Sequence, residues 1–344
     1  MPTRRPAISR PDDTESRRAD RLCDEDGASA GARTAAAQSA IRNPVRPLLK
    51  WAGGKRQLLP SLRPFFPPAF ERYFEPFVGS GAVFFDLFAT GRLEGRRAML
   101  ADSSADLIGC YRMVRDRTAG VLQALARLAR GHETGGAAHF YAVRERFNDA
   151  RGRLNGDVAG GYTPSMAAML LYLNRTGFNG LFRLNAAGRF NVPAGRYARP
   201  RICDPAHVST VAEALRAPGV SLALAPFESV LDAAGRGDLV YFDPPYAPLS
   251  VTSRFTSYTA RPFTIDDHAR LRDCAVQLAA RGCHVLVSNS SAAAIEALYE
   301  GAPNVAAAGL RVFRIPARRA INSRGSARGP VTELLLTNLT PLAT

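Results

Sequence analysis

The sequence of 344 residues predicts an α/β fold whose mostly parallel sheet belongs to one domain that is interrupted by a helical insertion. Two observations predict it. Short apolar runs typical of buried strands alternate with segments of helical periodicity towards both ends of the chain, whereas residues 116–173 between them have helical periodicity only. In addition, a glycine turn at residues 78–81 follows the first apolar run and precedes a helix, which is typical of a nucleotide-binding α/β fold.

The first half of the predicted sheet contains a candidate cofactor acid. Residues 73–77 are expected to form a strand that runs into the glycine turn, and residues 82–88 a helix. The next strand, 97–101, ends at Asp102, about twenty residues beyond the glycines, where such folds place an acid that binds ribose hydroxyls. Asp102 could instead be the N-cap of a helix over residues 103–114.

The later elements follow the same alternation. Strands are predicted at residues 221–225, 238–242 and 284–288, with a helix over 264–281 between the last two. Each strand is short and apolar enough to be buried in a sheet.

Composition favours an anionic partner. The formal net charge is +15, and residues 1–46 account for only two of these charges, since they hold nine arginines and seven acidic residues. A field of this sign attracts nucleic acid. The tail is rich in Ala, Arg and Asp and is expected to be disordered.

Membrane, secreted and zinc-binding classes are disfavoured. The chain has no apolar stretch long enough to cross a bilayer and no secretory signal, so a cytoplasmic location is expected. The five cysteines are odd in number and none are spaced as a metal knuckle, which argues against structural zinc.

The only two lysines among 45 basic residues, Lys50 and Lys55, flank the only tryptophan, Trp51, in one glycine-containing segment. A lysine supplies a compact ammonium where a planar guanidinium does not fit, so this segment is predicted to be a binding loop. Chance clustering of two residues is the alternative.

The motif Asp243-Pro244-Pro245-Tyr246 directly follows the apolar run 239–242. A carboxylate, a backbone carbonyl and an aromatic ring at a strand's carboxyl end could hold a planar amine, although Pro-Pro also ends strands in plain surface turns. Two acceptors would draw the amine lone pair out of conjugation, so that methyl transfer from a sulfonium would need chiefly alignment. Such chemistry requires neither a metal nor a covalent nucleophile.

Two basic runs without acids are candidate nucleic-acid surfaces. Residues 174–201 hold six arginines interleaved with aromatic residues, and residues 311–329 hold six more in a Gly/Ser-rich setting expected to form a loop over phosphates. A solvated basic face is the alternative for either run.

With these motifs in view, the chain resembles the DNA adenine N6-methyltransferase family, specifically its Dam type of the alpha motif order (D12 class). The likeness extends from about Leu48 to Leu335. It rests on the following segments in family order: Leu49–Lys55, Glu75–Gly81, Ala101–Asp102, Tyr172–Arg183, Phe190–Tyr197 and Asp243–Tyr246.

The resemblance implies a Rossmann-like S-adenosylmethionine-dependent methyltransferase fold with an inserted, mostly helical target-recognition domain. The implied division is a tail at 1–46, a split catalytic domain at 47–115 and 226–340, and an inserted domain at 116–225. We further expect the protein to be a monomer in the cytoplasm, associated with the nucleoid. It would methylate adenine N6 in duplex DNA, with GATC as the expected site, after flipping the base out of the helix.

The resemblance also implies roles for particular residues. Asp243, Pro244 and Tyr246 would be catalytic and hold the flipped adenine. Trp51, Lys55, Phe77, Gly79, Asp102 and Asp243 would bind S-adenosylmethionine. Asn179, Leu181, Arg183, Arg196 and Tyr197 would bind DNA. The aromatic loop Phe255–Tyr258 could help to enclose the base.

Other readings remain open at this point. A methyltransferase of the same fold could act on RNA adenine, on the cytosine N4 amine or on glutamine in a protein, and a DNA-binding relative could have lost catalysis. Cytosine ring-carbon methylation is disfavoured, because it needs a Pro-Cys nucleophile and no cysteine here follows a proline. A nicotinamide dehydrogenase would leave Asp243–Tyr246 and the basic runs unexplained. Residues 198–201 also depart from related proteins, which often have lysines there.

Overall fold

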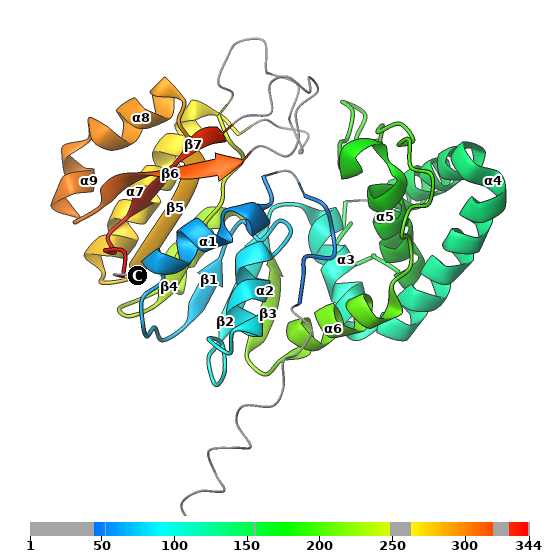
Figure 1. Ribbon diagram of the computed structural model, residues 1–344, viewed down its shortest axis with the longest axis horizontal. Helices are drawn as coiled ribbons and strands as arrows, with labels where there is room; N and C mark the ends of the chain where they lie inside the picture. Colours follow the sequence, from blue (N-terminus) through cyan, green and yellow to red (C-terminus); the bar gives the residue numbers. More distant parts are fainter. Residues whose placement is uncertain (1–44, 52, 155, 248–262, 319–329, 343–344) are drawn as a thin grey trace, which may run out of the picture. The chain divides into compact units, whose positions relative to one another are not determined.

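The computed structural model describes residues 45–51, 53–154, 156–247, 263–318 and 330–342. Within these residues a seven-stranded sheet has the order β3-β2-β1-β4-β5-β7-β6 (Figure 1). Its strands are β1 (Tyr73–Glu75), β2 (Ala98–Asp102), β3 (Val220–Leu224), β4 (Leu239–Phe242), β5 (His284–Ser290), β6 (Arg311–Arg318) and β7 (Pro330–Thr337). β1 to β5 pair in parallel, whereas β7 is antiparallel to both β5 and β6.

Helices cover both faces of the sheet. Alternate strand residues point to opposite faces, so Tyr73 and Tyr241 join one buried cluster while Phe74 and Phe242 join another. The first cluster includes side chains of α2 (Ala82–Ala89) and α3 (Ala105–Asp116). The second includes side chains of α7 (Ile265–Ala280), α8 (Ala293–Glu300) and α9 (Pro303–Ala307). Two apolar faces explain why β4 is apolar throughout, and the predicted Rossmann-like fold is confirmed.

The helical insertion lies between β2 and β3 in sequence. It contains α4 (Thr118–Gly152), which bends at Gly136, α5 (Pro164–Thr176) and α6 (Pro205–Arg216), drawn in green in Figure 1. α3 connects this block with the sheet, because it packs against α5 and α6 on one side and against β2 and β3 on the other. The predicted helical character of residues 116–173 is confirmed.

The insertion is predicted to end at residue 225, but β3 pairs with β2 over residues 220–224 and is the last strand at that side of the sheet. These five residues therefore belong to the sheet, and the inserted segment ends before Val220. The functional division into catalytic and target-recognition domains stays a prediction. Of the predicted tail, 1–46, residues 1–44 lie outside the described residues, and Val45 is buried in the core.

Residues 311–318 do not form the phosphate loop that their arginines predicted. They form β6, which pairs with β7 alone and lies at the opposite end of the sheet from β3. Arg314 on this strand pairs with Glu296 and Glu300 of α8. β6 is thus an edge strand, and charged side chains are common on edge strands because they discourage pairing with a strand of another molecule. The rest of the basic run, 319–329, lies outside the described residues.

The parallel strands bring distant parts of the sequence to one edge of the sheet. β1 and β4 are neighbours although more than 160 residues separate them, and the chain order reverses between them. Ligands of open α/β sheets bind at such a switch point, beyond the carboxyl ends of the strands. The glycine turn after β1, Asp102 at the end of β2 and Asp243 after β4 all lie at this edge.

Candidate active site

Asp243 and Lys55 form a largely buried ion pair at the end of β4. The Lys55 Nζ lies 2.7 Å from the Asp243 Oδ1, and the two side chains are 4% and 18% exposed. The ammonium also donates a hydrogen bond of 2.8 Å to the Gly53 carbonyl. Burial raises the pKa of Asp243 to about 6, and the positive charge of Lys55 opposes this rise.

The Tyr246 ring provides the second wall of this site. The Lys55 Nζ lies 4.2 Å from the centre of the ring, within the range of a cation–π contact. The Tyr246 hydroxyl donates a 2.5 Å hydrogen bond to the Glu333 Oε2 on β7. Pro244 is buried and Pro245 exposed, so the motif turns away from the sheet after the second residue. An amine is therefore held between a carboxylate and an aromatic ring.

A second layer of polar side chains supports Asp243. The Ser288 Oγ on β5 lies 3.4 Å from the Asp243 Oδ1, and the Tyr241 hydroxyl lies 2.9 Å from the same Ser288 oxygen. Tyr241 and Ser288 belong to the adjacent strands β4 and β5, and Asp243 directly follows β4. Ser288 and Glu333 were not predicted from the sequence, because each lies more than forty residues from the motif and belongs to no recognisable pattern of its own.

Asp102 binds the backbone of the glycine turn. Its Oδ2 accepts the Gly79 N–H at 3.0 Å, and its Oδ1 accepts the Ser104 N–H at 2.9 Å. Burial raises the pKa of Asp102 to about 6, although these hydrogen bonds favour the ionised form. The N-cap of α3 is Ser104, whose hydroxyl accepts the Leu107 N–H, so the alternative role of Asp102 as the cap is wrong.

The glycine turn between β1 and α2 needs glycine at two closely packed positions. Gly79 and Gly81 have φ of 45° and 69°, a region that side chains rarely adopt. A Cβ on Gly79 would lie only 3.1 Å from Trp51, so this glycine also allows the tryptophan to approach the turn. The Trp51 ring in turn stacks on Phe182, with centroids 5.5 Å apart. The absence of side chains at these two positions lets the backbone of the turn approach a neighbouring ring closely, as Trp51 does.

Phe77 is packed among other aromatic rings beside this turn. It stacks on Phe227 at 5.3 Å and makes edge contacts with Phe242 and Phe263. Glu75, at the end of β1, is a further carboxyl group of this region, and the sequence predicts no role for it. It is buried and accepts hydrogen bonds from the Tyr73 hydroxyl and the Phe84 N–H, and burial raises its pKa well above the ordinary value.

The predicted DNA-binding residues lie in one segment after α5, close to the lysine loop. The buried Asn174 joins the two: its Oδ1 accepts the Lys50 N–H at 2.8 Å, and its Nδ2 donates to the Lys50 and Gly180 carbonyls. The Lys50 Nζ lies 5.2 Å from the centre of the Tyr197 ring. The two segments that contain Lys50 and Tyr197, some 150 residues apart in sequence, thus meet in the structure.

The five predicted DNA-binding side chains differ in exposure. Arg196 and Tyr197 are exposed, and both line a cavity of about 390 Å³ next to the bend of α4. Asn179 is half-buried and adopts a φ of 54°, the only positive value at a residue other than glycine among the described residues. Leu181 packs at the edge of the core, and the Arg183 Nε donates to Asn191. The segment is therefore a partly exposed surface anchored by its own contacts.

Three further expectations concern the aromatic loop, metal binding and membrane spans. The aromatic loop Phe255–Tyr258 lies outside the described residues. Within them, no group of histidine, cysteine and acidic side chains could hold a metal ion. A search of the same residues finds no helix with both the length and the apolar character of a membrane span.

Comparison with known proteins assigns the chain to a family. A family described as D12 class N6 adenine-specific DNA methyltransferase matches residues 51–313. The type II methyltransferase M1.LlaDCHI of Lactococcus lactis subsp. cremoris is 38% identical over 296 residues, which cover 86% of this chain and 95% of the relative. M.MjaIII, a type II methyltransferase of Methanocaldococcus jannaschii, is 34% identical over 305 residues, or 86% of this chain and 99% of the relative. The DNA adenine methylase of Escherichia coli K12 is 38% identical over 293 residues, which cover 84% and 94% of the two chains.

Proposed function

Since this chain belongs to the D12 class N6 adenine-specific DNA methyltransferase family, we propose that it methylates the N6 amine of adenine in duplex GATC sites, after flipping the base out of the helix. The family itself implies an enzyme that uses S-adenosylmethionine and acts on DNA. The target sequence, base flipping and the roles of individual residues are the parts that this proposal adds.

The position of the Lys55 ammonium supports the proposal most directly. Its nitrogen is 2.7 Å from the Asp243 carboxylate and 4.2 Å from the centre of the Tyr246 ring. An adenine amine needs the same two partners, because its hydrogens require an acceptor and its ring requires a stacking surface. Lys55 would have to move from between these two groups when the base enters, which frees the Asp243 Oδ1 to accept a hydrogen bond from the amine.

Asp243, the Pro244 carbonyl and Tyr246 would then prepare the amine. The first two accept one amino hydrogen each, which draws the nitrogen lone pair out of conjugation with the ring. Tyr246 stacks on the base and fixes its plane, and its hydroxyl is itself held by Glu333. Neither acceptor must act as a strong base, since the main contribution is alignment of the amine.

Trp51, Lys55, Phe77, Gly79, Asp102 and Asp243 are the residues proposed to hold S-adenosylmethionine. This cofactor supplies an electrophilic methyl group on a sulfonium. The Asp102 carboxylate is fixed by two backbone N–H groups and has remaining acceptor capacity for ribose hydroxyls. Gly79 has a positive φ, a conformation that favours glycine, so this position of the turn between β1 and α2 has no side chain.

Duplex DNA is proposed to contact the segment of Asn179, Leu181, Arg183, Arg196 and Tyr197. This proposal is supported by Asn174, whose hydrogen bonds link the segment to the lysine loop that contains Lys55. GATC is proposed because of the likeness of this segment to that of Dam-type enzymes.

The test is methyl transfer from labelled S-adenosylmethionine to a GATC duplex, compared with the same duplex already methylated at adenine N6. Label is expected only in the unmethylated duplex. Asp243→Ala should lower kcat by about 10³-fold, the order found when a group that stabilises a transition state is removed, while duplex binding is kept. Asp266→Ala, which removes an exposed carboxylate on α7, is the matched control. Unchanged activity in Asp243→Ala would refute the role given to this residue.

A further inference from the structure

Residues 179–197, which contain the proposed DNA-binding side chains, are called the recognition segment here. A short hairpin over residues 183–191 forms part of it. Its two arms are joined by the Asn191 N–H to the Arg183 carbonyl at 3.2 Å and by the Asn185 N–H to the Arg189 carbonyl at 2.9 Å. A β-bridge pairs Leu184 with Phe190. An isolated two-stranded hairpin is marginally stable in water, so its position must be fixed by contacts with the rest of the protein.

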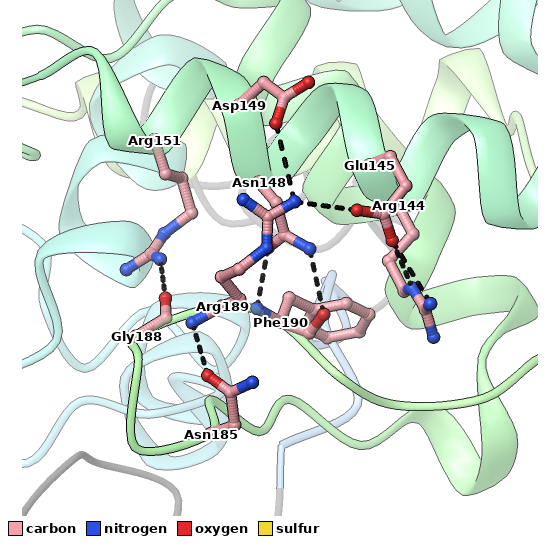
Figure 2. A network of polar contacts seen from close by, with 9 residues as sticks. All are labelled: Arg144, Glu145, Asn148, Asp149, Arg151, Asn185, Gly188, Arg189 and Phe190. Atoms are coloured by element: carbon pink, nitrogen blue, oxygen red, sulfur yellow. Dashed lines mark hydrogen bonds and ion pairs between the residues drawn. The ribbon is translucent and has the colours of Figure 1, made fainter.

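Asn148 of α4 supplies one of these contacts (Figure 2). Its Oδ1 accepts the Phe190 N–H at 2.7 Å, and its Nδ2 donates to the Phe190 carbonyl at 3.1 Å. The side-chain amide thus satisfies both backbone groups of one hairpin residue, as a neighbouring strand would. Asn148 is only 4% exposed, so the loss of these bonds would leave buried polar groups without partners.

Arg151, one turn further along α4, joins the hairpin to the catalytic domain. One end of its guanidinium donates to the Gly188 carbonyl in the hairpin turn (Figure 2). Its Nε donates to the Asp106 Oδ1 of α3 at 2.7 Å, and this pair is almost buried, with side-chain exposures of 13% and 5%. The Tyr162 hydroxyl lies 3.4 Å from the same Asp106 oxygen.

Asp106 lies on the helix that begins at the proposed cofactor site. Asp102 accepts the N–H of Ser104, which caps α3, and Asp106 is in the first turn of that helix. A continuous path of short contacts therefore connects Asp102 with the hairpin turn through Asp106 and Arg151. Exposed ion pairs of Arg189 with Glu145 and Asp149 add to the path at the surface, but exposed pairs contribute little.

Resting on the proposed function, we propose that Arg151 and Asn148 are positioning residues that hold the recognition hairpin in fixed register with the methyl-transfer site and thereby set discrimination between the target and near-target duplexes. In this proposal they act on DNA only through their contacts with the hairpin. A displacement of about 1 Å in such a support can cost about a hundredfold in rate, because the reacting groups must be closely aligned.

The geometry requires arginine at position 151. The guanidinium presents separate N–H groups on one rigid plane, and two of them bond Asp106 and Gly188 at once. Lysine would keep a positive charge beside the buried carboxylate, but its single nitrogen cannot occupy both donor positions. Arg151→Lys thus breaks the bridge but keeps a positive charge beside Asp106. An unpaired buried carboxylate, which would strongly destabilise the protein, is thereby avoided.

The experiment compares wild type, Arg151→Lys and Asn148→Leu with the control Arg127→Gln, an exposed arginine on the same helix. Methyl transfer is measured on a GATC duplex and on duplexes with one base pair of the site changed. We call Arg151→Lys and Asn148→Leu the clamp variants, because each removes a contact that holds the hairpin. In both, we expect the ratio of kcat/KM between the target and changed duplexes to fall by about tenfold, which is of the order of one specific base contact. The Kd for S-adenosylmethionine and the control's ratio should stay as in wild type.

Hydrogen exchange tests whether Arg151 and Asn148 hold the hairpin, independently of the effect on discrimination between duplexes. In both clamp variants the amides of residues 185–191 should exchange faster than in wild type, while those of β1 and β4 should not change. Unchanged exchange of the hairpin would overturn the proposal, and so would faster exchange with unchanged discrimination. If wild type methylates no duplex, the proposed function is refuted and the role in discrimination with it, while the exchange still decides whether the clamp exists.

Discussion

Lys55 and Glu333 act on the Asp243 carboxyl group in opposite directions. Burial has the largest effect and raises the pKa of Asp243 to about 6; the Lys55 ammonium lowers it, and the Glu333 carboxylate raises it. An aspartic acid of this pKa is mostly ionised at pH 7 but takes up a proton under mildly acidic conditions. The proposed role of Asp243 as an acceptor needs the ionised form.

The methyl-transfer rate is therefore expected to fall as the pH drops through about 6. In Glu333→Gln, loss of the negative charge should lower the pKa of Asp243 and move this fall in kcat/KM to lower pH. In Lys55→Gln, loss of the positive charge should raise the pKa and move the fall to higher pH, besides lowering the rate because Lys55 also belongs to the proposed cofactor site.

The measurement is kcat/KM between pH 5 and 8 for the three proteins, since this ratio reports the pKa values of the free enzyme. Asp266→Ala, an exposed carboxylate of α7, serves as the control and should keep the wild-type profile. Shifts of the same sign in both variants would contradict the assignment of the acidic limb to Asp243.

The site could be predicted from sequence where its residues follow a strand. Asp243 and Asp102 each stand at the carboxyl end of an apolar run, and parallel strands bring such ends together. Glu333 and Ser288 could not be found in this way. They reach the site through the pairing of β4 with β5 and of β5 with β7, and register between distant strands is not encoded in a local pattern.

Among the helices, α3 depends on a glycine at its contact with the insertion. A Cβ on Gly109 would lie 2.6 Å from the Tyr162 ring, so this glycine allows the helix to approach residue 162 closely. Gly152, in the last turn of α4, is exposed and has no atom within 4 Å of the corresponding position. Alanine is otherwise preferred in helices by about 1 kcal/mol, so the two positions should respond with opposite sign.

Gly109→Ala is expected to destabilise the protein by about 1–2 kcal/mol, because overpacking costs about 1–3 kcal/mol and exceeds the gain in helix propensity. Gly152→Ala should stabilise it by about 0.5–1 kcal/mol. The free energy of unfolding from urea titration measures both. A stable Gly109→Ala protein would mean that Tyr162 can move away at little cost.

Elements were predictable in proportion to their local signals. The helix predicted over 264–281 agrees with α7 to within one residue at each end, and in the structure a capping box of Thr264 and Asp267 marks its start. β6 was missed because Arg311 and Arg314 resemble a basic loop, whereas the strand is defined by its pairing with β7. For β3, the strand itself was predicted, but its place beside β2 was not, since the intervening helices hide that neighbour in the sequence.

Over the whole molecule, the excess positive charge predicts the class of partner but not the surface that binds it. Of the first basic run, Arg189 is paired with Glu145, and Arg175 donates to the Leu48 carbonyl. Arg196, in contrast, is exposed beside the cavity at the recognition segment. The charge that remains available for phosphates is therefore uneven along a run that appears uniform in sequence.

This unevenness predicts how DNA binding should depend on salt. Each neutralised phosphate contributes about −0.9 to the slope of log K against log salt concentration, because counterions are released from the duplex. Arg196→Gln should therefore make the slope shallower by about 1 and weaken binding to all duplex sequences alike.

Arg97→Gln removes the same charge from an exposed position just before β2, at the amino-terminal ends of the parallel strands. It should leave the slope unchanged. The two slopes can be measured by fluorescence anisotropy with a labelled duplex between about 50 and 200 mM salt, the range over which such contacts weaken strongly. Equal changes in both variants would mean that the net charge of the molecule, and not the surface around Arg196, determines its affinity for DNA.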